Sequence, residues 1–158
     1  MALYPVAGMH IYIGAALSDK STDFVAADFA SQVWTEIDGW SACGATGDKG
    51  ALITTAVINR GRDMKMKGTA NAGQMQNEFT QLVTDAGQIA LLAASLPTNK
   101  NSYAVRVDLN DAAGGAPGKR YFIALVMDFE ESGGGANTAR MVKSTFEVNS
   151  NIVRVAAT

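Results

Sequence analysis

The stretch GQMQNEFTQLVTDAGQIALLAASLP, residues 73–97, changes its hydrophobic period half-way along its length. In the first half, Met75 and Phe79 stand among polar residues at a period of two, which is typical of a β-strand with one covered face. In the second half, apolar residues recur every three or four positions, which predicts a helix over about 84–96. The stretch therefore predicts a strand that leads into a helix.

Both ends of the predicted helix carry boundary signals. Asp85 can cap the first turn, and Gln88 three residues later completes the pattern of a capping box. Pro97 ends the helix because proline cannot continue the backbone hydrogen bonding. This is the one segment of the sequence with helical periodicity, so a single helix is expected.

The segments around this stretch alternate with a period of two. Two of them, 51–59 and 120–129, are apolar on both faces, which indicates strands covered on two sides. The segments 51–59 and 74–83 are predicted to pair as a long hairpin. The other predicted strands are 9–14, 33–40, 103–110 and 140–155, the last with a bulge or turn at 149–151.

The order of these elements predicts the fold class. Many short strands and a single helix indicate a mainly β protein, an antiparallel β-sandwich or open barrel with one flanking α-helix. The length of 158 residues suits one domain over 1–158. Within it, residues 15–31 and 60–73 are predicted to be long connections.

The composition limits the kinds of partner. Apolar residues make up 47% and charged residues 18%, below the ~25% charge of an average domain. Weakly polar surface of this kind is often covered by another chain. The net charge of −2 excludes a chain that is basic overall, as nucleic-acid-binding domains commonly are.

Charge is unevenly distributed along the sequence. Residues 1–59 hold two basic and six acidic side chains, whereas 60–67 hold four basic and one acidic. Opposite charges on different parts of one chain suit head-to-tail contact between identical subunits. The predicted inter-subunit contact loop consists of Arg60, Arg62, Asp63, Lys65 and Lys67, and its candidate acidic partners are Asp19, Asp23, Asp28 and Asp48.

The basic stretch RGRDMKMKGTANAG, residues 60–73, could also bind phosphate or nucleic acid. A phosphate-binding loop would need Lys-Ser/Thr after its second glycine and a helix behind it, and this stretch has neither. Single-stranded nucleic acid would need stacking partners, and 60–78 contains no aromatic residue. Two interpretations therefore stay open for this stretch, a solvated hairpin tip and a contact with another subunit.

The sequence offers little for catalysis or metal binding. His10 and Cys43 are each the only residue of their kind, which excludes an intrachain disulfide and a Cys/His zinc site within one chain. His10 is predicted to be packed or at an interface, and Cys43 to be a small buried hydrophobe. Glu36 and Asp38 share a predicted strand face, but nothing nearby marks a sugar cleft. We therefore predict no enzyme activity, no catalytic or metal-binding residue and no cofactor.

Targeting signals are equally sparse. The stretch MALYPVAGMHIYIG, residues 1–14, lacks a basic region and is interrupted by glycines, unlike a signal peptide. The longest strongly apolar run, 121–127, is too short to cross a bilayer. The chain is expected to be made in the cytoplasm without a membrane partner, and to remain soluble or assemble there.

In their order, these segments resemble the tail tube (major tail) proteins of long-tailed bacteriophages. The resemblance covers most of the chain and rests on diffuse motifs. They are WTEIDGWSACG (34–44), the loop at 60–73, NEFTQLVTDAGQIALLAA (77–94), RYFIALVMDFEESGG (120–134) and STFEVNSNIVRV (144–155).

The resemblance implies a β-sandwich or barrel subunit with one flanking helix. Such subunits form hexameric rings that stack head to tail into the tail tube of the virion, in contact with other tail proteins. Genomic DNA then leaves through the tube without specific binding. The residues leave one other class open, a monomeric β-sandwich that binds carbohydrate or a surface through an aromatic patch around Trp34, Trp40 or Tyr103.

Overall fold

The alternating segments pair into a sheet of nine strands in the computed structural model, which describes residues 2–112 and 114–158. The strands are β1 (His10–Ala16), β2 (Thr35–Glu36), β3 (Trp40–Ala42), β6 (Gln74–Thr80), β7 (Tyr103–Asp108), β8 (Lys119–Val126), β9 (Glu130–Ser132), β10 (Met141–Val148) and β11 (Val153–Val155). Seven of them follow the order β2-β1-β7-β8-β10-β6-β3, while β11 pairs with β8 and β9 with β10. All of these pairs are antiparallel, which confirms the predicted mainly β class.

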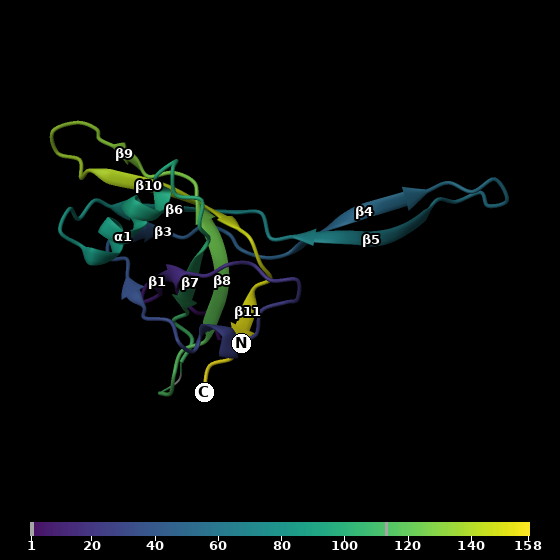
Figure 1. Ribbon diagram of the computed structural model, residues 1–158, viewed down its shortest axis with the longest axis horizontal. Helices are drawn as coiled ribbons and strands as arrows, with labels where there is room; N and C mark the ends of the chain where they lie inside the picture. The colour runs from purple at the N-terminus through teal and green to yellow at the C-terminus, as the bar shows by residue number, and fades with distance from the viewer. Residues whose placement is uncertain (1, 113) are drawn as a thin grey trace.

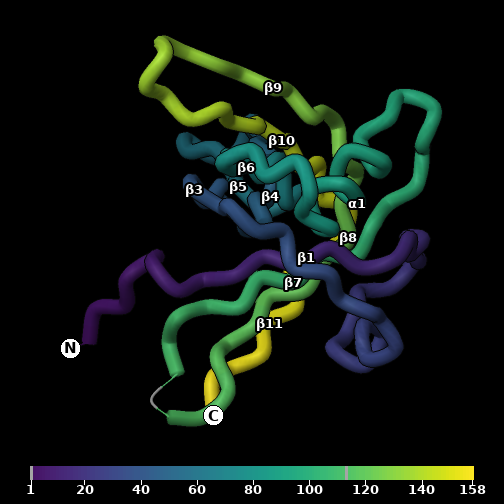
Figure 2. The backbone as a smooth tube through the Cα atoms, turned by 90° about the vertical axis from the view of Figure 1, so that its left-hand side faces the viewer, coloured from purple at the N-terminus to yellow at the C-terminus, as the bar shows by residue number. Residues whose placement is uncertain are grey.

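The sheet curls into an open half-barrel with a single helix, α1 (Ala86–Ser95), at its side. Figure 2 shows β10, β6 and β3 standing over β1 and β7, with α1 beside them. Because the sheet bends back over itself, apolar side chains from distant strands meet on its inner face. The central position of β8 agrees with the prediction that 120–129 is covered on two sides.

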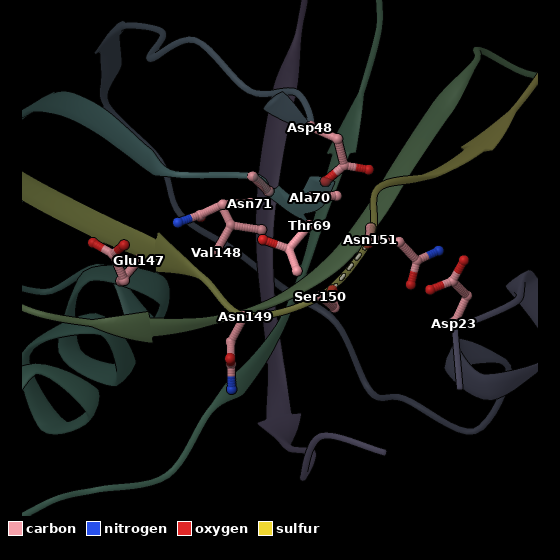
Figure 3. A pocket seen from close by; sticks show the side chains of 11 residues that line it. Asp23, Asp48, Thr69, Ala70, Asn71, Glu147, Val148, Asn149, Ser150 and Asn151 are labelled. Atoms are coloured by element: carbon pink, nitrogen blue, oxygen red, sulfur yellow. Dashed lines mark hydrogen bonds between the residues drawn. The ribbon is translucent and has the colours of Figure 1, made fainter. Parts of the chain in front are cut away.

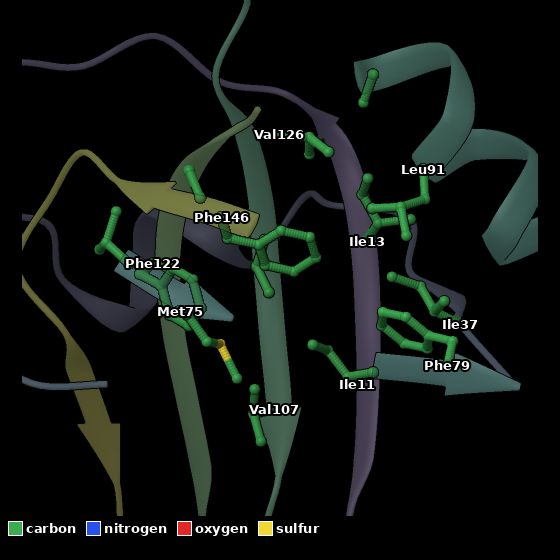
Figure 4. Close-up of a cluster of buried hydrophobic side chains, with 14 of the residues drawn as sticks. Ile11, Ile13, Ile37, Met75, Phe79, Leu91, Val107, Phe122, Val126 and Phe146 are labelled. Carbon is green, nitrogen blue, oxygen red and sulfur yellow. The ribbon is translucent and has the colours of Figure 1, made fainter. Parts of the chain in front are cut away.

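The main core fills the inner face of the curled sheet (Figure 4). Phe79 of β6 and Phe146 of β10 are completely buried there, and α1 contributes Leu91. The helix therefore packs one face against the core, as expected from apolar residues that recur every three or four positions. Other members of this cluster are Ile11, Ile13, Ile37, Met75, Val105, Val107, Phe122, Val126 and Val142.

A smaller cluster covers the outer face of β7 and β8. The connection over 15–31 wraps this face and forms one short 3₁₀ turn, η1 (Ala26–Phe29). Phe29 stacks on Tyr121 with ring centroids 5.2 Å apart, and Phe24 packs beside them. The predicted long connection thus supplies the second cover of the central strands.

The helix begins where the sequence predicts, but its capping differs. Asp85 accepts a hydrogen bond from the Gln88 amide at 2.8 Å. The Gln88 side chain does not return to Asp85: it accepts from the Leu82 amide at 3.0 Å and donates to the Thr80 carbonyl at 2.8 Å. Buried among three chain segments, this side chain also donates to the Asp38 carbonyl at 2.9 Å. Gln88 therefore joins the segments around α1 instead of completing a capping box.

The largest departure from the sequence prediction is a separate two-stranded arm. Strand β4 (Lys49–Thr55) pairs with β5 (Met64–Asn71), and the predicted pairing of 51–59 with 74–83 is wrong. The segment 60–73 is therefore not a simple connection, because most of it is β5. Figure 1 shows these two strands projecting far from the sheet, with the turn between them at the outer end. We call residues 49–71 the arm.

Two shorter corrections concern strand boundaries. The segment 33–40 forms two strands, β2 and β3, because Gly39 at φ +79° turns the chain between them. A side chain at position 39 would collide with the backbone, because a Cβ on Gly39 would lie 2.6 Å from the Thr80 carbonyl oxygen. The predicted interruption at 149–151 is confirmed and separates β10 from β11. There the Ser150 hydroxyl accepts from the Ile123 amide at 3.0 Å.

Candidate inter-subunit surface

The arm has two chemically different faces. Residues opposite each other in an antiparallel pair point to the same side, and successive residues point to opposite sides. Ile53 pairs with Met66, which gives one side an apolar methionine face. Leu52 pairs with Lys67 on the other side, which we call the lysine face. Met64, opposite Thr55, belongs to the methionine face, and Lys65, opposite Thr54, to the lysine face.

Both faces of the arm are exposed. Ile53 has 45% and Met66 63% of its surface accessible, whereas a sheet strand usually hides one face. The prediction that 51–59 is covered on two sides is therefore not met within this chain. A two-stranded hairpin alone is marginally stable in water, so the exposed arm is a candidate surface for contact with another chain.

The predicted contact loop spans the turn of this arm and part of its second strand. Arg60, Arg62 and Asp63 lie in the turn beyond β4, and Lys65 and Lys67 lie on β5. All five side chains are exposed. Within residues 2–112 and 114–158, none of the four cations takes part in an ion pair. The structure thus brings the predicted residues together on one projecting element.

The four candidate acidic partners separate into different environments. Asp28 is bonded to Lys20 at 2.6 Å, and Asp19 lies exposed in the connection after β1. Asp23 and Asp48 line one hollow of about 610 Å³ at the root of the arm (Figure 3). Glu147 of β10 lines it as well, and the sequence analysis did not include it among the partners.

We call this cavity the root hollow. Its lining consists of Asp23, Asp48, Thr69, Ala70, Asn71, Ala72, Glu147, Val148, Asn149, Ser150 and Asn151. Three of these side chains are acidic and none is basic. The alternation of 140–155 places Glu147 on the outer side of β10, but the convergence of three segments depends on tertiary structure that no local pattern contains.

Asp28 should have a pKa below its ordinary value of 3.8. The hydrogen bond from Lys20 is the main cause, and a second bond from the Val25 amide adds to it. Because folding favours the charged carboxylate, Asp28 stabilises the protein above the unfolded pKa and loses this effect as the pH falls through the folded pKa. An NMR titration of dissociated subunits should detect the low pKa, and Lys20→Gln should raise it. A pKa that Lys20→Gln leaves unchanged would contradict this assignment.

His10 and Cys43, the residues considered for chemistry, are both exposed. His10 is exposed and bonds to Glu36, so it is not packed within the single chain, and its predicted place at an interface stays a prediction. Cys43 is exposed, not buried; its thiol donates to the Gly44 carbonyl at 3.3 Å, and partial desolvation raises its pKa. In the part of the chain that the structure describes, no group of three potential metal ligands occurs, and no helix is long and apolar enough to cross a membrane.

The three aromatic residues considered for a binding module do not gather in one patch. Trp34 lies half-buried in the outer cluster, near Arg106, whose guanidinium carbon is 5.4 Å from its ring. Trp40 and Tyr103 pack instead against the inner core. The Trp40 indole nitrogen donates to Asn77 at 3.1 Å. The three aromatic residues are thus divided between the two faces of the sheet.

The comparisons with known proteins agree with this architecture. No protein-family model and no curated protein sequence matches the chain. Among solved structures, the SPP1 tail tube aligns with a TM-score of 0.64 at 14% identity, covering 96% of this chain and 80% of that one. This chain has the fold of a tail tube protein. The resemblance seen in the sequence is therefore confirmed at the level of the fold.

Two other structures match the tail tube fold of this chain over nearly its whole length. A chain of the anti-feeding prophage baseplate, solved with six-fold symmetry, has a TM-score of 0.71 at 8% identity, covering 99% of this chain and 98% of that one. A chain of the sheath/tube terminator of the PVC extracellular contractile injection system has a TM-score of 0.70 at 13% identity, covering 99% of each. These similar structures come from tube and baseplate assemblies, not from enzymes.

Proposed function

We propose that this chain is a structural subunit that assembles with copies of itself into a tube. The observation that carries the proposal is the arm, which projects from the sheet with both of its faces exposed. A neighbouring subunit that covers the arm would remove its apolar side chains from water. The end-to-end match with chains of tubes and baseplates supports the same conclusion.

The proposed assembly is a stack of hexameric rings in the tail of a phage virion. The six-fold symmetry applied to one similar assembly supports the ring number. The contact loop at Arg60, Arg62, Asp63, Lys65 and Lys67 lies between subunits, and carboxylates of another copy meet its cations. Other tail proteins contact the ends of the stack.

The tube acts as a conduit for DNA and has no catalytic role. Each contact between a cation and a phosphate adds affinity, so a conduit should hold few cations in its channel. We propose that the channel surface is acidic or neutral and that the basic part of the arm faces protein.

Electron microscopy of the purified chain tests this proposal directly. We expect rings or tubes, and light scattering should report a mass that rises with protein concentration as subunits associate. Rings with six-fold averages would support the ring number. A compact monomer at every concentration would overturn the proposal and favour a monomeric binding module.

A further inference from the structure

We propose that the root hollow of one subunit receives the lysine face of the arm of a second copy. This inference rests on the proposed function, because it assumes that the chain assembles with itself. It adds which face of the arm is bound and which surface receives it. Each subunit would then offer an arm at one end and a receiving surface at the root of that arm.

The root hollow has the chemistry that a lysine-bearing strand requires. Asp23, Asp48 and Glu147 come from three different segments and lie around the hollow in Figure 3. Within the described parts of the chain, none of the three has an ion pair or a side-chain hydrogen bond. Their charge is therefore uncompensated at a concave surface, where opposite charge would be attracted most strongly.

The surroundings of the hollow are held in place by specific contacts. Asn151 accepts from the Phe24 amide at 2.7 Å and donates to the Phe24 carbonyl at 3.0 Å, which fixes the chain next to Asp23. The Val148 amide donates to the Gly73 carbonyl at 2.9 Å and fixes β10 to the root of the arm. The hollow is thus formed by the folded subunit before a partner arrives, which lowers the entropic cost of binding.

The lysine face is opposite in charge to this surface. Lys65 and Lys67 are two residues apart on one strand, so their Cα atoms are roughly 7 Å apart on the same side. Arg60 and Arg62 lie just beyond them in the turn. Three carboxylates at the hollow would then meet a segment, 60–67, that carries four cations and one carboxylate.

The turn of the arm lies far from the hollow of its own subunit. Figure 1 shows the arm extending away from the sheet, so its basic turn lies at the opposite end from its root. The hollow itself is partly lined by Thr69, Ala70 and Asn71 at the inner end of the arm. A donor surface and a receiving surface at different places on one chain generate a head-to-tail contact, which closes into rings or extends into filaments. The partner is therefore a second copy of this chain.

Charge reversal on both sides of the proposed contact tests it in the full-length chain. Lys65→Glu with Lys67→Glu should raise the concentration needed for assembly about tenfold or more at 0.15 M salt, because like charges would meet in the hollow. Asp48→Lys with Glu147→Lys should have a similar effect. The chain carrying all four substitutions should assemble again, since the two reversed surfaces attract each other. Electron microscopy and light scattering provide the measurement, and circular dichroism checks that each variant is folded.

The matched control for the Lys65 and Lys67 variant changes the net charge by the same amount at other exposed places. Lys100→Glu with Arg140→Glu alters neither the arm nor the root hollow, so assembly should change by less than about threefold if position matters more than net charge. Two results would overturn the inference: normal assembly of the Lys65 and Lys67 variant, or failure of the four-fold variant to recover assembly. In either case the wild-type chain would still form tubes if the proposed function is correct, so the two failures are distinguishable.

Discussion

Shortening the arm should give a folded protein that no longer assembles. The variant replaces residues 51–69 by a tight Asn-Gly turn, which suits a two-residue hairpin. Because β4 and β5 form their own sheet, the nine strands of the main sheet keep all of their partners. We expect light scattering to report a monomer at concentrations where the wild-type chain forms tubes, and thermal unfolding to stay cooperative.

The control for this deletion is a second exposed loop of the same chain. Removing residues 133–135, which lie between β9 and β10, shortens the surface without touching the arm or the root hollow. That variant should retain assembly. Tubes formed by the shortened arm would show that the arm does not hold subunits together. Loss of the folded sheet in the shortened variant would show instead that the arm stabilises the subunit.

The parts of the fold that follow local rules could be predicted from the sequence. The helix was predicted at about 84–96 and occurs at Ala86–Ser95, because its periodicity, its capping residue and Pro97 agree. The strand with Met75 and Phe79 was equally clear, since its two faces differ strongly in polarity. These signals act over a few residues and depend little on the rest of the chain.

The arm could not be predicted from local sequence patterns. Strand β4 is apolar on both sides, and a buried central strand has the same pattern, so the sequence alone indicates cover on two sides. Other segments of the same chain cover both faces of β8, whereas no segment of the chain covers β4 in the described residues. The alternation at Met64–Lys67 signals a strand, but the glycine and basic residues around it suggested a connection.

The root hollow could be predicted only in part. Asp23 and Asp48 were chosen because negative charge is concentrated in the first third of the sequence. That reasoning does not distinguish them from Asp28, which Lys20 neutralises, because the pairing depends on how the connection folds around η1. Glu147 is more than 90 residues from either aspartate, so only the tertiary structure brings it to the hollow.

Phe146→Ala should be the most destabilising single substitution considered for the body of the subunit. Phe146 is completely buried in the inner core, and Figure 4 shows its ring among the other core side chains. Removing the ring leaves a cavity that the sheet can only partly fill, at a cost of about 3–5 kcal/mol. For a chain of 158 residues this corresponds to a Tm lower by about 6–20 °C. Urea or thermal unfolding of dilute, dissociated subunits provides the measurement.

Assembly should offset part of this loss of stability, so the measured Tm should depend on the protein concentration. If only folded subunits enter the tube, association stabilises the folded state by mass action, so the apparent Tm rises with concentration. Phe146→Ala should therefore be strongly destabilised when dilute and less so when concentrated, whereas the shortened arm should show no such dependence. Leu92→Ala, on the exposed side of α1, is the matched control and should cost less than about 1 kcal/mol in dilute subunits. A cost for Phe146→Ala as small as that of Leu92→Ala would mean that the inner face of the sheet does not form the core.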